Sequence, residues 1–300
     1  MAAPRIAAFP KCYIEDIVSG RMDLLDWIDG AVALEPEGLE LYAGFLHDRS
    51  APALKAVRQR AEGHGLPIPM LCYSPDFTQP DPDARQREVA EQIEMIRVTA
   101  ELGGTFCRTL SGQRRDGLAV DDGVDMVVSC IEQCLPEAER CGVCVVMENH
   151  YKDGFWQFPE FAQQMDVFLK VIGRIDSPRF GVQYDPSNAI VAGDDPLELL
   201  ARVKHRVLTM HASDRYLLPG HSLEELKEAE GQTGYADILQ HGVTGKGMND
   251  YEAIFTTLRE VDFDGWISIE DGMNGMDEMR ESIDFLKAMR EKHFGGGRSA

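Results

Sequence analysis

Short apolar runs alternate with longer amphipathic segments along almost the whole chain. The runs are rich in Val, Ile and Leu, which is typical of strands that are buried on both faces. The longer segments carry apolar residues at helical spacing. In residues 83–102, for example, the apolar residues recur at intervals of three or four: Val89, Ile93, Ile96 and Ala100. Alternation of this kind predicts strands joined by helices, and therefore a parallel sheet.

The alternation repeats eight times. We predict strands over residues 5–9, 38–42, 68–73, 105–110, 143–147, 180–184, 207–210 and 266–269. We predict helices over residues 14–28, 51–63, 83–102, 121–141, 161–172, 196–203, 251–261 and 276–290. Eight units predict a closed (β/α)8 barrel, a TIM barrel of the α/β class, with its site at the C-terminal ends of the strands. An open doubly wound sheet is disfavoured, because no G-x-G-x-x-G motif follows an early strand.

Residues 1–294 are therefore predicted to form one domain, and residues 295–300 a disordered tail. The connection over residues 214–249 is far longer than the roughly 2–6 residues of ordinary barrel loops. We predict a loop inserted after the seventh strand at the catalytic face, with a short acidic helix over residues 223–230. Such a loop acts as a lid or a substrate wall. The alternative is a surface decoration or a contact between subunits.

The last four predicted strands each end in a side chain that can ligate a metal. These side chains are Glu148, Asp185, His211 and Glu270. A single such residue is more often a salt-bridged carboxylate or a structural histidine. Four of them at the same end of consecutive strands, however, need compensation for their buried charge. Three carboxylates and one imidazole form a mostly oxygen ligand set, so we predict one divalent cation in the mouth of the barrel.

The charge of the chain narrows the range of partners. The 300 residues carry a formal net charge of −21. This charge argues against nucleic acids, which are bound through Lys and Arg, and against anionic membrane surfaces. No apolar run approaches the roughly 20 residues of a membrane span, and no signal peptide is visible at the N-terminus. We therefore expect a cytoplasmic protein that acts on a small molecule.

The seven cysteines do not suggest a zinc site. Cys141 and Cys144 make a lone C-x-x-C, and a zinc knuckle would need a second pair at similar spacing. Reduced, buried thiols are the expected state.

These residues resemble the xylose isomerase-like superfamily of sugar isomerases and epimerases over about residues 5–290. Its members include ketose 3-epimerases, hydroxypyruvate isomerases and inosose dehydratases. Glu148, Asp185, His211 and Glu270 match the family's metal ligands in order. The run Gly245-Lys246-Gly247, followed by Asn249-Asp250-Tyr251, looks like its glycine-rich approach to the last helical units. Residues 263–270 look like its final strand.

Two positions depart from the pattern that the resemblance implies. Many epimerases place a histidine three residues after the aspartate of the sixth strand, where this chain has Asn188. Many members also read x-Lys-Asp after the metal histidine, where this chain has Ala212-Ser213-Asp214. Both positions concern substrate contacts or the surroundings of the metal. The substrate is therefore harder to infer than the metal.

The resemblance implies a metal-dependent isomerase or epimerase that works through an enediolate. A bound Mn²⁺, with Mg²⁺ or Co²⁺ as alternatives, would polarise a carbonyl oxygen of the substrate. Glu148 and Glu270 are our candidates for the pair that removes and returns the proton, because they lie on different strands that flank the metal. His150, two residues beyond Glu148, is a third catalytic candidate, as a proton donor or as the base of an elimination. Asp185 and His211 would be mainly ligands.

Further residues are candidates for contacts around the substrate. Asp214 would orient His211 or bind a substrate hydroxyl, and Arg108 would contact an anionic group or a hydroxyl, unless it pairs with a neighbouring loop. The aromatic candidates for the pocket wall are Tyr73, Phe155 and Trp156, although packing is the commoner role of such residues. The remaining candidates for substrate binding are Asn188, Arg215 and Lys246.

Three other functions compete with an isomerase. The first is a lyase on the same metal platform, either an inosose-type dehydratase or a C-glycoside-cleaving subunit with a heteromeric partner. The second is a DNA-repair endonuclease of the superfamily, which the charge of −21 opposes. The third is a carbohydrate-binding barrel without catalysis. For any of these enzymes we expect a homo-oligomer.

Overall fold

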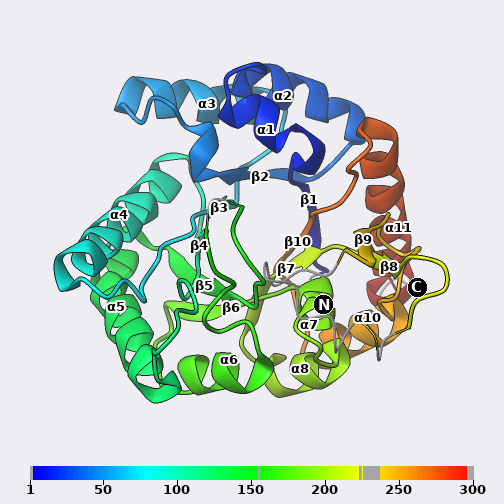
Figure 1. Ribbon diagram of the computed structural model, residues 1–300. Helices are drawn as coiled ribbons and strands as arrows, with labels where there is room; N and C mark the ends of the chain where they lie inside the picture. Colours follow the sequence, from blue (N-terminus) through cyan, green and yellow to red (C-terminus); the bar gives the residue numbers. More distant parts are fainter. Residues whose placement is uncertain (1–2, 155, 223–224, 226–236, 296–300) are drawn as a thin grey trace.

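The computed structural model describes residues 3–154, 156–222, 225 and 237–295. Eight parallel strands close into a barrel in the order β1-β10-β7-β6-β5-β4-β3-β2. Helices surround this barrel on all sides (Figure 1). The predicted TIM barrel is therefore confirmed. The strands of the barrel are β1 Arg5–Ala8, β2 Gly38–Tyr42, β3 Met70–Cys72, β4 Phe106–Thr109, β5 Cys144–Glu148, β6 Phe180–Tyr184, β7 Val207–Ala212 and β10 Trp266–Ile269.

The helices between the strands follow the predicted rhythm. They are α1 Ile14–Val18, α2 Leu24–Ala31, α3 Ala51–Gly63, α4 Pro82–Glu101, α5 Val120–Cys141, α6 Met165–Ile172, α7 Pro186–Val191, α8 Pro196–Val203, α10 Tyr251–Glu260 and α11 Met276–Phe294. Short 3₁₀ turns occur over Lys11–Tyr13, Val32–Leu34 and Ala43–Phe45. No helix in the described ranges combines enough length with enough apolar character to cross a bilayer.

Two predicted helical segments differ in detail from the structure, and one short helix was not predicted. The helix predicted over 14–28 is two helices, because the chain turns at Gly20 with φ +75° and Asp23 then caps α2 by accepting from the Leu25 amide. The helix predicted from residue 161 begins only at Met165. The short α7 is an addition that the sequence pattern did not predict, and it begins directly after Asp185.

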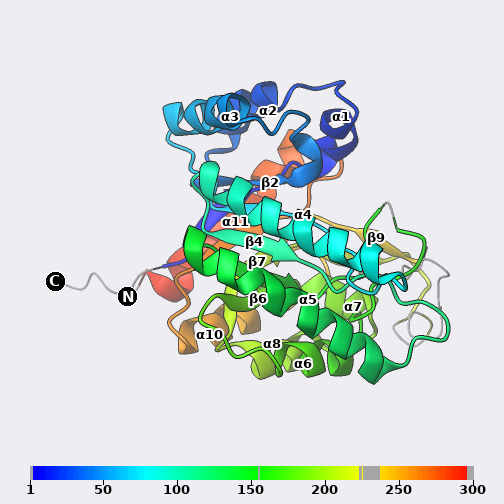
Figure 2. The same cartoon turned by 90° about the vertical axis from the view of Figure 1, so that its left-hand side faces the viewer.

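The long connection after β7 contains a two-stranded antiparallel hairpin, β8 Arg215–Leu217 and β9 Leu239–His241. Figure 2 shows this hairpin at one end of the barrel, with the C-terminal end of α11 at the other. The acidic helix predicted over residues 223–230 lies, apart from Glu225, outside the described residues. Most of the predicted disordered tail lies outside them as well.

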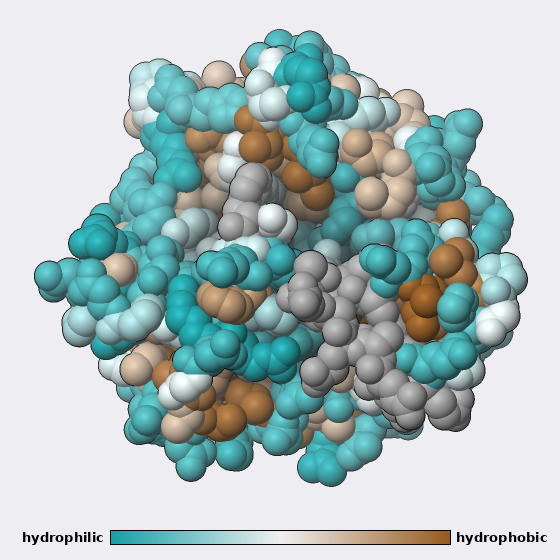
Figure 3. Space-filling model, viewed as in Figure 1, coloured by the Kyte–Doolittle hydropathy of each residue, from teal (hydrophilic) through white to brown (hydrophobic). Residues whose placement is uncertain are grey.

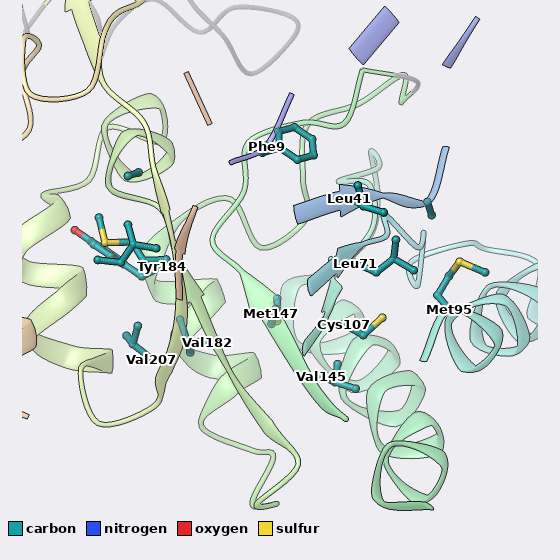
Figure 4. Close-up of a cluster of buried hydrophobic side chains, with 14 of the residues drawn as sticks. Phe9, Leu41, Leu71, Met95, Cys107, Val145, Met147, Val182, Tyr184 and Val207 are labelled. Carbon is teal, nitrogen blue, oxygen red and sulfur yellow. The ribbon is translucent and has the colours of Figure 1, made fainter. Parts of the chain in front are cut away.

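The main hydrophobic core fills the space between strands and helices. Leu41, Leu71, Cys107 and Val145 are fully buried on the outer side of their strands, and Met95 of α4 lies opposite them (Figure 4). Side chains alternate along a strand, so the neighbours of these core residues point into the barrel. This alternation directs Glu40, Arg108, Glu148 and His211 inward, toward the barrel axis.

All seven cysteines are free thiols, as expected. Cys72, Cys107, Cys130 and Cys134 are buried, whereas the other three are only partly buried.

Candidate metal centre

The four residues predicted as metal ligands meet at the C-terminal end of the barrel. Each of Glu148, Asp185, His211 and Glu270 offers one ligand atom, and these atoms all lie within 4.8 Å of one another. Glu148 ends β5, Asp185 follows β6, His211 lies near the end of β7, and Glu270 follows β10. The first three side chains are fully buried and that of Glu270 is nearly so.

Asp185 shows most directly that a cation fits this group. Its Oδ1 accepts from the amides of Ser187 and Asn188, at 2.7 and 3.0 Å, and from the Ser213 hydroxyl at 2.9 Å. Its Oδ2 is buried and has no hydrogen-bond partner among the residues that the structure describes. Burial, and then the charges of Glu270 and Glu148, raise the pKa of Asp185 to about 7. A buried carboxylate oxygen without a partner is costly, so a cation at this point fits the residues present.

In both Glu148 and Glu270, the two carboxylate oxygens have different partners. One oxygen of each faces His211 Nδ1, with Glu148 Oε1 at 3.2 Å and Glu270 Oε2 at 3.5 Å. The other oxygen is held by a cation. Arg108 Nη1 lies 2.7 Å from Glu148 Oε2, and Lys11 Nζ lies 2.9 Å from Glu270 Oε1.

These cations outweigh the effect of burial on the two glutamates. Burial alone would raise the pKa of Glu148, but His211 and Arg108 lower it to about 2. Burial would likewise raise the pKa of Glu270, yet Lys11 and His211 lower it below its usual range. Both side chains are therefore ionised and ready to ligate a metal, but each is a weak base in this arrangement.

His211 is held from both sides. Its Nδ1 faces the carboxylates of the group, and its Nε2 lies 2.5 Å from Glu40 Oε1. Glu40 lies in the middle of β2, is fully buried, and also accepts a hydrogen bond from the Cys72 thiol at 2.9 Å. Glu40, Cys72 and His211 form a second cluster with metal-ligand chemistry, which shares His211 with the first.

His150 has a carboxylate partner of its own. His150 Nδ1 lies 3.4 Å from Glu160 Oε2, and both residues are buried. The other oxygen of Glu160 accepts from the Ser111 amide and hydroxyl, both at 2.6 Å. Burial alone would lower the pKa of His150, but Glu148 and Glu160 raise it above its ordinary value.

A cavity of about 520 Å³ opens beside the metal group. Charged residues line its inner part, among them Lys11, Arg108, His150 and Glu270, and the apolar part includes Phe9, Ile14, Val18 and Tyr42. The face viewed in Figure 3 is hollowed near its middle, and hydrophilic residues dominate the surrounding surface. A cavity of this kind accepts a polar small molecule with its reactive end next to the carboxylates.

A sequence model described as the xylose isomerase-like TIM barrel matches residues 28–289, which is most of the chain. The chain belongs to this family. The barrel resembles the crystal structure of a D-tagatose 3-epimerase-like protein, with a TM-score of 0.75, 17% identity, and coverage of 96% of this chain and 97% of the other. It also resembles the IolI protein, whose structure has a bound zinc atom, with a TM-score of 0.72, 14% identity, and coverage of 97% and 99%. These likenesses concern the fold.

Among curated proteins, the chain is similar to an inosose dehydratase of Lacticaseibacillus casei. The two are 23% identical over 150 residues, which are 50% of this chain and 47% of the relative. The chain thus spans less than half the length of the curated relatives that it matches. Membership of the xylose isomerase-like family and a closed parallel barrel are therefore established, and the activity of this member is a matter of proposal.

Two further predicted residues lie beside the metal group of this family member. Arg108 pairs with Glu148, as described, and its Nη2 also donates to the Ser74 hydroxyl at 2.9 Å. Asn188, which stands where many epimerases have histidine, donates from Nδ2 to Glu148 Oε1 at 3.1 Å. Both side chains therefore hold Glu148, a candidate metal ligand.

The other predicted contacts have different surroundings. Asp214 accepts from backbone amides of residues 245–249, and the carboxylate that approaches His211 Nε2 is that of Glu40 instead. Arg215 is buried, with its guanidinium carbon 5.8 Å from the Tyr151 ring centroid. Lys246 is exposed and pairs with Glu281 of α11, so it does not line the cavity.

Two of the three residues predicted as an aromatic wall do not line the described part of this cavity. Trp156 is half-buried and does not line the cavity. Tyr73 does not line it either, and its hydroxyl donates to Glu88 at 3.2 Å. Phe155 lies outside the described residues. The aromatic residues that do line the cavity include Phe9, Tyr42 and Tyr151.

Sequence reasoning missed three charged residues of the site: Lys11, Glu40 and Glu160. A signal for Glu40 was present, because a carboxylate in the middle of the apolar strand 38–42 must be buried and needs a partner. Lys11 follows the first strand at its C-terminal end, where functional residues of a barrel gather. Glu160 lies in a loop without a regular pattern, so no comparable signal marked it.

Proposed function

We propose that this protein is a divalent-metal-dependent enzyme that removes a proton from the carbon next to a carbonyl group of a sugar-like substrate. The observation that carries the proposal is the group of three carboxylates and one imidazole, with the unpartnered Oδ2 of Asp185. Glu148, Asp185, His211 and Glu270 would hold the ion. Mn²⁺ suits these mostly hard donors, with Mg²⁺ or Co²⁺ as alternatives, and zinc is bound by the IolI neighbour.

The ion, when bound, would polarise the carbonyl oxygen of the substrate and stabilise the enediolate. The chain must then supply groups that move the proton. Two outcomes share this first step. An isomerase or epimerase returns a proton to carbon, whereas a lyase expels a leaving group from the neighbouring carbon. The name of the D-tagatose 3-epimerase-like neighbour supports the first outcome, and that of the inosose dehydratase relative supports the second.

The arrangement of charges favours the lyase. Arg108 and Lys11 hold the second oxygens of Glu148 and Glu270, so that neither carboxylate has an unpaired oxygen ready to accept a proton from the substrate. His150 lines the same cavity, and Glu160 holds its Nδ1 side. Its pKa is raised by Glu148 and Glu160, which makes the ring a stronger base, so His150 could act as base and then as donor to a departing hydroxyl. For this reason we place elimination before isomerisation, the reverse of the order that the sequence suggested.

The experiment uses Mn²⁺-loaded protein with keto-sugars and keto-cyclitols in D₂O, followed by proton NMR and mass spectrometry. Loss of water and formation of an unsaturated product would support the lyase. Deuterium next to the carbonyl without loss of water would support an isomerase or epimerase. Binding without either change would favour a carbohydrate-binding barrel and contradict the proposal.

Two variants locate the proton transfer. His150→Gln should lower turnover by about 10²- to 10⁴-fold, the usual contribution of a general acid or base, with the metal content unchanged. The matched control is His221→Gln, because His221 is an exposed histidine that pairs with Glu225 outside the cavity. Full activity in His150→Gln would exclude His150 from the chemistry. Glu148 and Glu270 would then be the first candidates for the groups that transfer the proton.

A further inference from the structure

Glu40 is a fully buried charged residue to which neither the ligand set nor the proposed chemistry assigns a role. Its side chain is fully buried within β2, on the inward side of the strand. Glu40 Oε1 accepts from the Cys72 thiol at 2.9 Å and lies 2.5 Å from His211 Nε2. A buried carboxylate is destabilising unless its partners compensate for its desolvation, so its placement in the barrel interior calls for an explanation.

The ring of His211 offers that explanation. Glu40 approaches one ring nitrogen, and the carboxylates of Glu148 and Glu270 approach the other, Nδ1, at 3.2 and 3.5 Å. A neutral imidazole has one N–H and one lone pair. A carboxylate can only accept, and Glu40 is the closer carboxylate, at 2.5 Å against 3.2 Å for Glu148, so it takes the hydrogen on Nε2. A bound ion would then take the lone pair of Nδ1, in place of a proton directed at Glu148.

We propose that Glu40 is a positioning residue, which fixes the ring orientation and tautomer of His211 so that Nδ1 is the metal-ligating nitrogen. This inference rests on the metal site of the proposed function, and not on which reaction the site performs. Cys72 supports the same arrangement, because its thiol donates to the oxygen that holds His211. Ordering of this kind is known to strengthen a metal–histidine bond and to raise the basicity of the ligand.

The inference also decides between the two clusters that share His211. Glu40, Cys72 and His211 could themselves hold a metal through Nε2 and the Cys72 sulfur. His211 offers a single lone pair when neutral, so it cannot serve both clusters at once. Our assignment places the ion with Glu148, Asp185 and Glu270, and makes the Glu40–Cys72 pair its support.

Titration of the full chain with Mn²⁺ and Co²⁺ tests the assignment, with metal affinity measured by calorimetry. Glu40→Gln keeps the shape of the side chain and removes its charge, so we expect a 10- to 100-fold weaker affinity with the fold retained. The matched control is Glu160→Gln, another fully buried glutamate, which contacts His150 and not a metal ligand. Its metal affinity should equal that of the wild type.

Two measurements on the wild-type protein keep the test independent of how well Glu40→Gln folds. ¹⁵N NMR of the metal-loaded protein should show the His211 proton on Nε2. The Co²⁺ spectrum should lack a thiolate-to-cobalt charge-transfer band. A ligated Nε2, a thiolate band, or equal affinities of wild type and folded Glu40→Gln would overturn the assignment. A wild type that binds no metal would instead refute the proposed function, and the assignment with it.

Discussion

At the scale of single residues, Asp185 and His211 hold protons that a metal ion must displace. Burial and the charges of Glu270 and Glu148 raise the pKa of Asp185 to about 7. Burial would lower the pKa of His211, but Glu40 and Glu148 outweigh it and raise that pKa well above its ordinary value. In the metal-free protein both groups are therefore protonated in mildly acidic solution, and metal binding must release these protons.

We therefore predict that metal affinity rises with pH from about pH 6 to about pH 8. Calorimetry in buffers of different ionisation heat should detect proton release on binding. The release should be larger near pH 6, where Asp185 still holds its proton, than near pH 8, where that proton is largely lost. Binding heats that do not depend on the buffer would contradict the assigned ligands.

The cluster of candidate ligands could be predicted from the sequence, whereas the contacts that hold these side chains could not. Glu148, Asp185 and Glu270 stand at the ends of apolar runs, and strand ends in a parallel barrel converge by geometry. Glu40 contacts a histidine 171 positions away across the barrel, and Lys11 contacts a glutamate 259 positions away. Such pairings depend on the closure and register of the barrel, which no local pattern encodes.

At the scale of secondary-structure elements, the loop before α10 is tied to the barrel by one carboxylate. Asp214 Oδ2 accepts from the amides of Gly245 and Gly247, at 3.0 and 2.9 Å, and Oδ1 accepts from Asn249 and Arg215, at 3.1 and 3.0 Å. The glycine at 247 is required by close approach, because a Cβ there would lie 2.3 Å from Arg215 O and from Asp214 Oδ1. The glycine-rich motif thus wraps around Asp214.

We predict that Asp214→Ala destabilises the protein by more than about 3 kcal/mol, because several backbone donors lose their acceptor at once. Asp250→Ala is the control at the end of the same loop. Asp250 caps α10 through the Ala253 amide, and removal of such a cap costs about 1 kcal/mol. Urea denaturation of both variants measures the difference. A loss in Asp214→Ala no greater than that in Asp250→Ala would show that the loop is held by other contacts.

Most elements followed from the periodicity of the sequence, but one predicted helix is interrupted and several short elements were missed. The apolar residues of 14–28 recur at helical spacing on both sides of Gly20, because both α1 and α2 pack against the core. The turn at Gly20 therefore left no sign in the apolar pattern. The short α7 was missed because its six residues are too few to show a helical period. Asp185 followed by Pro186 is a typical start of a helix, but from the sequence we assign Asp185 to the metal and not to a helix cap.

At the scale of the whole molecule, the barrel places the carboxylates of Glu148, Asp185 and Glu270 close together at the C-terminal ends of its strands. A cation bound between them would stabilise the fold. In the metal-free protein, the pKa of Asp185 is higher when folded than its ordinary value of 3.8 when unfolded. Its contribution to stability is therefore present in acid and is lost as the pH rises through about 7. A bound ion reverses this by favouring the ionised side chain, and it stabilises the fold by about 2.7 kcal/mol at a concentration of 100 Kd.

We therefore predict that a chelator lowers the Tm of the wild-type protein by several degrees near pH 8, and that added Mn²⁺ restores it. Asp185→Asn removes the charge and keeps an acceptor for Ser187, Asn188 and Ser213. Its metal-free Tm near pH 8 should be at least that of the metal-free wild type, and Mn²⁺ should raise it little. Melting curves with and without metal decide the matter. If the variant is less stable than the metal-free wild type, or still gains the full shift from Mn²⁺, Asp185 is not the residue that links the ion to the stability of the barrel.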